Sequence, residues 1–160
     1  MCIRDSSHCH LTYAPMSNAL NETIDRANKD GIKYMLTIST VDKSFEQILK
    51  IVNGYESVYG TYGIHPHEAK SHQHIKSDDI INKVNKNKKI IGIGETGLDF
   101  YYNHSEKKDQ IYSFEEHISA AQKKNLPLIV HTRSAEKETL QILEKHSKKK
   151  ETKILIHCFT

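Results

Sequence analysis

Short apolar segments alternate along this chain with longer segments that have the periodicity of a helix. The short segments are rich in β-branched and aromatic residues, and we expect them to be buried strands at 33–39, 58–64, 89–94, 127–131 and 153–157. Strands that alternate with helices form a parallel sheet covered by helices. The alternation therefore predicts an α/β fold, either an open doubly wound sheet or a closed TIM (β/α)₈ barrel.

Apolar residues recur every three or four positions in the segments between these strands. One helix is expected to begin at the capping-box pattern Ser44 to Gln47, another after Ser77, and a third after the candidate cap Ser134. These helices would cover the sheet on the outside.

The length of the chain bears on which α/β fold it adopts. A complete barrel usually needs roughly 250 residues, whereas this chain has 160. We therefore expect residues 1–160 to form one incomplete barrel domain that stops after about the sixth strand and lacks the last strands. Apart from Met1, residues 1–6 have only Cys2 and Ile3 as apolar side chains, which predicts that a native first strand is degraded or replaced.

Composition excludes several classes of protein. The net charge of +3 is too small, and the charges too interspersed, for a strongly basic nucleic-acid surface. The three cysteines are odd in number and contain no CxxC pair, so neither a disulfide framework nor a zinc knuckle is expected. The sequence contains no long apolar run and no signal-peptide core. We therefore predict a cytoplasmic protein with no membrane contact and no obligate protein partner.

Histidines and one glutamate stand at the ends of the predicted strands. His8 and His10 are two positions apart, so both side chains would point to the same face of a strand. Glu95, His131 and His157 each follow an apolar run. All strand carboxyl ends of a parallel βα array lie on one face, so these five side chains are expected to converge there as metal ligands. Nitrogen donors with a carboxylate suit Zn²⁺, Mn²⁺, Fe²⁺ or Ni²⁺ better than Ca²⁺.

Five further residues are candidates for substrate contact at the same face. His65 and His67 end the third strand and could orient a phosphate or a ligand of the metal, the alternative being a turn fixed by Pro66. Arg133 is a candidate phosphate clamp, or else part of a surface ion pair. Asp99 and Tyr101 follow Glu95, although Asp99 could instead be a helix N-cap and Tyr101 a cover for the barrel rim.

The remaining histidines lie in polar loops or on helix faces, and we assign no function to His72, His74, His104, His117 and His146. Cys9 and Cys158 neighbour predicted ligands but would point away from them in regular strands. We expect both to be buried and unreactive.

Five motifs, taken together and in this order, resemble the TatD family of metal-dependent hydrolases. They are Ser7-His8-Cys9-His10-Leu11, Gly63-Ile64-His65-Pro66-His67, Gly94-Glu95-Thr96-Gly97-Leu98-Asp99-Phe100-Tyr101, His131-Thr132-Arg133 and His157-Cys158-Phe159. The resemblance covers nearly the whole chain. It implies a TIM barrel of the amidohydrolase type, two divalent metal ions, and phosphodiesterase or 3′ exonuclease activity on DNA.

The resemblance also implies a role for each ligand. His8 and His10 would hold one metal ion, His131 and His157 the other, and the catalytic Glu95 would bridge them. Mg²⁺, Mn²⁺, Zn²⁺, Fe²⁺ and Ni²⁺ are not distinguished. The sequence departs from the family at Ser6, where an aspartate is usual, and the family's late aspartate has no counterpart because the chain ends first.

The resulting hypothesis is two-metal hydrolysis of a DNA phosphodiester by an activated water, most readily at single strands or strand ends. One alternative is an amidohydrolase that cleaves a C–N or ester bond of a small molecule, because the same chemistry attacks a carbonyl carbon. Another is an inactive fragment that only binds metal or nucleic acid.

Overall fold

Six parallel strands form one sheet in the computed structural model, which describes residues 4–148 and 150–157. The strands are β1 (Arg4–Cys9), β2 (Ile32–Thr37), β3 (Val58–Tyr62), β4 (Ile90–Asp99), β5 (Leu128–Arg133) and β6 (Ile154–Ile156). Each strand pairs only with its neighbours in sequence, in the order β1-β2-β3-β4-β5-β6.

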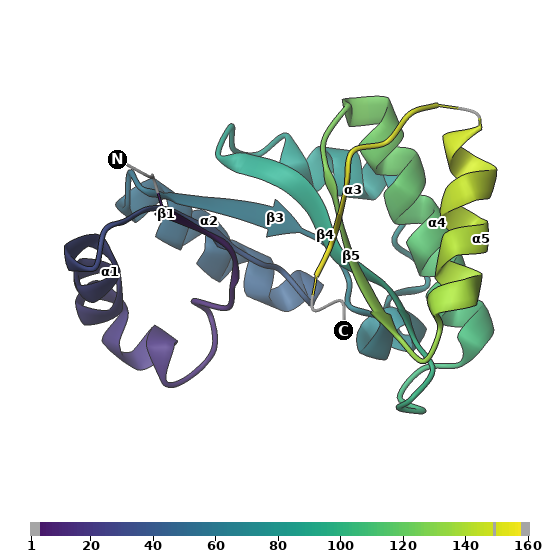
Figure 1. Ribbon diagram of the computed structural model, residues 1–160, viewed down its shortest axis with the longest axis horizontal. Coiled ribbons are helices and arrows are strands. Elements are labelled where there is room, and N and C mark those ends of the chain that lie inside the picture. Colours follow the sequence, from purple (N-terminus) through teal and green to yellow (C-terminus); the bar gives the residue numbers. More distant parts are fainter. Residues whose placement is uncertain (1–3, 149, 158–160) are drawn as a thin grey trace.

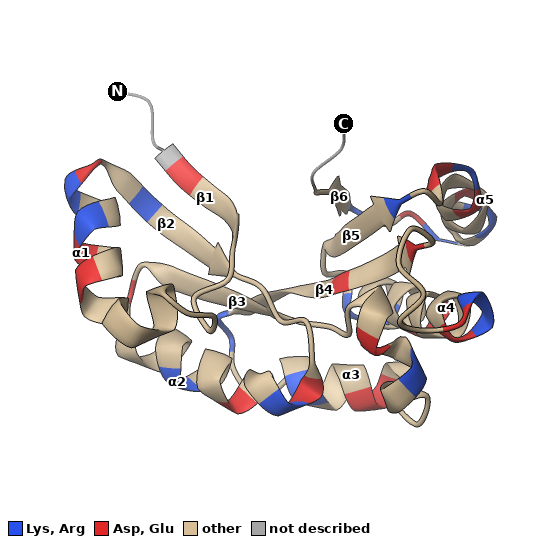
Figure 2. Cartoon of the chain, turned by 90° about the horizontal axis from the view of Figure 1, so that it is seen from below, with Lys and Arg blue, Asp and Glu red and all other residues tan. Residues whose placement is uncertain are grey.

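The sheet is curled into an open trough, and the helices cover its outer face (Figures 1 and 2). They are α1 (Leu20–Lys29), α2 (Phe45–Gly54), α3 (Ser77–Val84), α4 (Lys107–Lys124) and α5 (Glu136–Ser147), with short 3₁₀ turns η1 (Met16–Ala19), η2 (Asp42–Ser44) and η3 (Pro66–His72). A doubly wound sheet has a reversal in strand order and helices on both faces. The sequential order and one-sided helices therefore confirm the barrel arrangement. None of the described helices is both long and apolar enough to cross a membrane.

The first strand forms despite its polar sequence. Residues 4–6 belong to β1, which pairs with β2 in parallel through Arg4 and Ile32, Ser6 and Met35, and Cys9 and Thr37. Backbone hydrogen bonds hold this strand in the sheet, and the replacement of a native first strand stays a prediction. Residues 1–3 lie outside the described residues.

Strand β4 is longer than predicted, because it continues through its glycines to Asp99 instead of ending at residue 94. Beyond Glu95, β4 pairs with β5 residue by residue, including Gly97 with His131. Ser44 is the N-cap residue of α2, as predicted, but the expected capping box does not form. Ser44 makes no cap hydrogen bond and donates instead to the Val41 carbonyl oxygen, while Ser134 precedes the N-cap Ala135 and has a φ of 51°.

The hydrophobic core lies between the outer face of the sheet and the helices. Its fully buried members include Phe45, Ile48, Tyr62, Phe114 and Ile118. On the other face of the sheet, large side chains remain exposed. Tyr34 precedes the buried Met35, and Ile91 follows the buried Ile90. Because successive side chains of a strand point to opposite faces, Tyr34 and Ile91 point to the inside of the trough.

One buried histidine positions the end of β3. His117 on α4 is almost wholly buried, accepts a hydrogen bond from Ile64 N at 3.1 Å through Nε2, and donates from Nδ1 to the Ser113 carbonyl oxygen at 2.7 Å. Burial lowers the pKa of His117 from 6.5 to about 4. The neutral ring therefore anchors the backbone one residue before His65.

We expect His117→Phe to lower the free energy of unfolding at pH 7.5 by about 1–3 kcal/mol, because Ile64 N–H loses its acceptor. The unfolded chain protonates His117 near pH 6.5, whereas the folded protein does so only near pH 4. The stability that neutral His117 provides is thus present above pH 6.5 and is lost as the pH falls towards 4.

Urea unfolding of both proteins between pH 7.5 and pH 5 checks this expectation, and the difference between them should shrink as the pH falls. His74→Phe, at an exposed histidine, is the matched control and should show no such trend. A difference that stays constant with pH would contradict the assigned role.

Candidate metal centre

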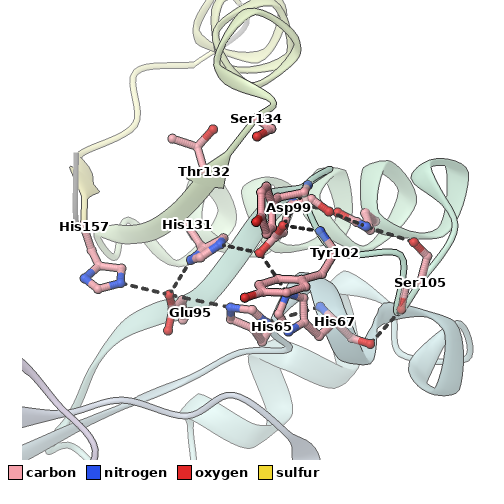
Figure 3. A network of polar contacts seen from close by, with 12 residues as sticks. His65, His67, Glu95, Asp99, Tyr102, Ser105, His131, Thr132, Ser134 and His157 are labelled. Atoms are coloured by element: carbon pink, nitrogen blue, oxygen red, sulfur yellow. Dashed lines mark hydrogen bonds and ion pairs between the residues drawn. The ribbon is translucent and has the colours of Figure 1, made fainter. Parts of the chain in front are cut away.

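Glu95 lies at the centre of a group of imidazoles at the carboxyl ends of the strands (Figure 3). Its side chain is almost completely buried. Glu95 Oε1 lies 3.1 Å from His131 Nδ1, 3.4 Å from His157 Nε2 and 4.0 Å from His65 Nε2. Glu95 Oε2 lies 3.6 Å from His8 Nε2. Four imidazoles that are far apart in sequence thus surround one carboxylate.

His8 and His10 present their Nε2 atoms to each other at 3.2 Å. The ring of His8 also stacks on that of His157, with centroids 3.7 Å apart. His8 Nδ1 and His10 Nδ1 are buried and have no hydrogen-bond partner among the described residues. Sequence reasoning placed both side chains at this face, and the structure places them there.

His65 is closer to the centre than the sequence indicated. Beside its 4.0 Å approach to Glu95, its ring lies 4.6 Å from that of His131. Its Nδ1 accepts a hydrogen bond from His67 N at 3.2 Å, which closes the turn at Pro66. The motif His65-Pro66-His67 at the end of a predicted strand indicated that His65 lies at this face of the sheet. Its distance from Glu95 could not be predicted, because that distance depends on the curl of the sheet.

Asp99 connects two imidazoles rather than capping a helix. Its Oδ2 contacts His67 Nε2 at 2.8 Å and His131 Nε2 at 3.2 Å. Its Oδ1 accepts hydrogen bonds from the backbone N–H groups of Tyr101 and Tyr102, both at 3.1 Å. This is the behaviour of an aspartate in a turn, and it leaves His131 between two carboxylates.

The electrostatics of the group favour an ionised carboxylate among neutral rings. Burial raises the pKa of Glu95, but its contacts with His131 and His8 outweigh burial and lower that pKa overall. Burial lowers the pKa of His65 to about 3 and also lowers the pKa values of His10 and His157. A neutral imidazole keeps a lone pair with which it can bind a metal ion.

His131 differs from the other rings. Burial lowers its pKa, but Glu95 and Asp99 together have the larger effect and raise it. A histidine that ligates a metal through one nitrogen usually donates its other N–H to a carboxylate or carbonyl. Asp99 supplies such a carboxylate to His131.

The donor atoms fall into two groups that fit divalent metal ions. In each group, the ligand atoms lie within 4.8 Å of one another, and the groups are His8, His10 and Glu95, and His65, Glu95 and His131. Both groups share Glu95 and combine imidazole nitrogen with carboxylate oxygen. This chemistry suits Zn²⁺, Mn²⁺, Fe²⁺ and Ni²⁺. The Nδ1 atoms of His8 and His10, which have no hydrogen-bond partner among the described residues, are further nitrogen atoms that can bind a metal ion.

A cavity of about 350 Å³ opens over this group. It is lined by His10, Tyr13, Thr40, Val41, His65, His67, Glu68, Glu95, His131 and His157. No local sequence pattern pointed to Tyr13, Thr40 or Val41 as lining residues. Tyr101 and Arg133, which were predicted to contact substrate, are not among the lining residues and lie beside one another, with the guanidinium carbon 4.0 Å from the centre of the tyrosine ring.

The residues left without a predicted function include one that belongs to the same region. His104 lies 4.7 Å from His67, measured between ring centres. Cys9 is half-buried rather than buried as expected. Its thiol donates to the Leu36 carbonyl oxygen, and burial raises the pKa of the thiol to about 11, which agrees with an unreactive side chain. Cys158 lies outside the described residues.

A curled sheet of parallel strands that carries a histidine–carboxylate group at its carboxyl ends defines the class of barrel metal-dependent hydrolases. Within that class, the chain belongs to the family described as TatD related DNase, whose sequence profile matches residues 6–160. The resemblance inferred from the five motifs is thereby confirmed.

Individual relatives agree with this assignment. The chain is 34% identical over 158 residues to an uncharacterized metal-dependent hydrolase of Buchnera aphidicola subsp. Baizongia pistaciae, a match that covers 96% of this chain and 58% of that protein. It is 30% identical over 151 residues to the 3'-5' ssDNA/RNA exonuclease TatD of Salmonella typhimurium, covering 94% of this chain and 57% of that protein. The chain therefore spans less than two thirds of the length of these relatives.

Solved structures confirm the fold. The TatD homologue YjjV from Escherichia coli matches with a TM-score of 0.83 and 22% identity, over 99% of this chain and 61% of its own. A TatD family hydrolase from Entamoeba histolytica matches with a TM-score of 0.85 and 22% identity, over 98% of this chain and 58% of its own. The six-stranded trough thus corresponds to part of a larger barrel in both proteins.

Proposed function

We propose that the protein is a two-metal phosphodiesterase that hydrolyses single-stranded DNA from its 3′ end. The observation that supports this most directly is the position of Glu95, which approaches imidazoles from β1, β5 and the residues after β3 and β6. The similarity to the Salmonella exonuclease supports the choice of substrate.

The strand-end residues would hold the metal ions. His8 and His10 would bind one ion, His131 and His157 the other, and Glu95 would contact both. Bound divalent ions would supply the Lewis acidity that activates a water for phosphodiester hydrolysis. Asp99 would keep the rings of His67 and His131 in place through its contacts of 2.8 and 3.2 Å.

The substrate would be recognised at the cavity mouth. His65 and His67 line the cavity. Arg133 stacks on Tyr101 and Tyr102, and Tyr102 contacts His67, so the permanent charge of Arg133 would neutralise a phosphate beside the cavity. Because the net charge of the chain is only +3, attraction for DNA would depend on this local positive charge rather than on the whole surface. Strand ends suit such a site better than the groove of a long duplex.

Hydrolysis of a 5′-labelled single-stranded oligonucleotide with Mg²⁺ or Mn²⁺ tests the proposal. We expect products that shorten stepwise from the 3′ end, slower cleavage of the same strand in a blunt duplex, and no cleavage with a chelator. Hydrolysis of lactones or cyclic amides without cleavage of the oligonucleotide would favour an amidohydrolase instead. Metal binding without hydrolysis of either substrate would indicate a non-catalytic protein.

Metal binding itself should be visible in the stability of the protein. At a metal concentration a hundredfold above Kd, binding to the folded state alone stabilises it by about 2.7 kcal/mol. We therefore expect Mn²⁺ or Zn²⁺ to raise Tm of the metal-free protein by roughly 5–11 °C in a calorimetric scan. His10→Gln should lose most of this increase.

His74→Gln, which changes an exposed histidine outside the cavity, is the control and should keep the full increase in Tm. If His10→Gln and the unaltered protein gain the same stability from metal, His10 is not a ligand.

A further inference from the structure

Exposed rings and a guanidinium gather beside the metal centre. The cluster, which we term the aromatic rim, consists of Tyr101, Tyr102, His104 and Arg133. Tyr101 is 62% exposed and Tyr102 is 42% exposed. The two tyrosine rings meet edge to face with centroids 4.8 Å apart, and His104 stacks against Tyr102 at 5.5 Å. Tyrosine is enriched at binding interfaces, because its ring combines a large apolar face with a polar hydroxyl.

The loop that carries these rings is held firmly in place. Gln110 donates its side-chain amide to the carbonyl oxygens of Asp99 and Ser105, each at 3.0 Å, and accepts from Asp99 N at 2.8 Å. Ser105 donates to the His67 carbonyl oxygen at 2.8 Å (Figure 3). Asp99 also accepts the backbone N–H groups of both tyrosines. The rings are therefore positioned before any ligand arrives, which lowers the entropic cost of binding.

Arg133 contributes a planar cation to the same cluster. Its guanidinium carbon lies 4.0 Å from the centre of the Tyr101 ring and 4.8 Å from that of Tyr102. None of the ion pairs found between described residues includes Arg133, so the alternative of a surface salt bridge is not supported. A stacked guanidinium keeps its N–H groups in its own plane, where they can still donate to a phosphate.

The aromatic rim adjoins the candidate metal centre through His67. The ring of His67 lies 5.4 Å from that of Tyr102 and 4.7 Å from that of His104, and its Nε2 contacts Asp99, which in turn contacts His131. A ligand that binds at the rim would thus place an adjoining group over the centre.

We propose that the aromatic rim stacks on an unpaired nucleobase next to the phosphodiester bond that is hydrolysed. This inference rests on the proposed function and specifies how its substrate is chosen. Flat π-faces and a guanidinium are the groups that proteins use to stack bases of single strands without regard to sequence. Paired bases in a duplex are already stacked on each other, so the aromatic rim selects strand ends that are single-stranded.

The experiment compares two 5′-labelled oligonucleotides that differ only at the last two 3′ positions, which carry bases in one and tetrahydrofuran residues without bases in the other. The unaltered protein should show a lower KM for the oligonucleotide with bases, by about 5- to 150-fold for one stacked base. Tyr101→Ala should remove most of this preference, because it should raise KM far more for the oligonucleotide with bases than for the baseless oligonucleotide. Metal-free protein should also quench the fluorescence of 2-aminopurine at the 3′ end, and Tyr101→Ala should not.

Two controls separate the ring from other effects. Tyr101→Phe keeps the π-face and should keep the preference, while Tyr112→Ala removes an exposed tyrosine on α4 and should behave as the unaltered protein does. Base stacking would be overturned, and the proposed function would stand, if the unaltered protein hydrolysed both oligonucleotides equally. The same conclusion would follow if Tyr101→Ala lowered kcat/KM equally for both oligonucleotides. Failure to hydrolyse either oligonucleotide would overturn the proposed function and this inference with it.

Discussion

Glu95→Gln is expected to lower kcat/KM for the oligonucleotide by about a thousandfold or more, because metal-ion catalysis contributes several kcal/mol to the transition state. Glutamine has nearly the same volume, but its amide nitrogen cannot replace a carboxylate oxygen as a ligand. The change would also break the contacts of Glu95 with His131 and His8. Steady-state kinetics over a range of metal concentrations would measure the loss.

Glu46→Gln provides the matched control, since Glu46 is an exposed carboxylate on α2 that pairs with Lys86 at 2.9 Å. It should leave kcat/KM within about twofold, as expected of a weak surface ion pair. Near-UV circular dichroism should show the same fold in all three proteins. If Glu95→Gln is nearly as active as the unaltered protein, Glu95 is not a ligand of a catalytic metal ion.

Gly97→Ala is expected to destabilise the protein by more than about 4 kcal/mol, or to prevent folding. Gly97 has a φ of +133°, and a Cβ atom there would lie 2.1 Å from the His131 carbonyl oxygen. That oxygen belongs to the backbone of the paired strand β5, so it cannot rotate away as a side chain would. Both the backbone strain and the overlap oppose any side chain at this position.

Thermal unfolding followed by circular dichroism checks this, and 4 kcal/mol corresponds to a decrease in Tm of roughly 8–16 °C. Gly54→Ala is the control, because nothing lies within 4 Å of a Cβ at the end of α2 and its backbone is ordinary. Alanine should be neutral or slightly stabilising there. A Tm for Gly97→Ala within about 3 °C of the unaltered protein would refute the close packing of β4 and β5.

The periodicity of the chain was sufficient to predict β2 to β6 and their common direction, whereas the polar β1 was not predicted from it. Where strands end in apolar runs, as before His131, the ends were predicted within a few residues. Convergence of His8, Glu95 and His157 at one face followed from parallel strands alone, without knowledge of their order. Their roles as ligands remain predictions.

Other features depend on contacts that no local pattern contains. The glycines within β4 are typical of a turn, and the sequence therefore suggested that the strand ends at residue 94. Gly97 lacks a side chain because β5 lies against it, and this contact is visible only in the folded structure. No sequence pattern distinguished His117 from other histidines on helices, because its role depends on the hydrogen bond that it accepts from the distant Ile64 N. The stacking of Arg133 on Tyr101 joins a strand to a loop more than thirty residues away, and its geometry required the curled sheet.

The anchored loop after β4 has a consequence for how such a protein could acquire new substrates. The candidate ligands belong to strand ends, which pairing within the sheet holds fixed, whereas the stacking rings belong to a surface segment fastened by Gln110 and Ser105. Residues 101–104 could therefore be exchanged for other side chains while those fastenings, and the chemistry beside them, stay intact. A redesigned segment on the same frame would offer an unchanged candidate metal centre to molecules of a different shape.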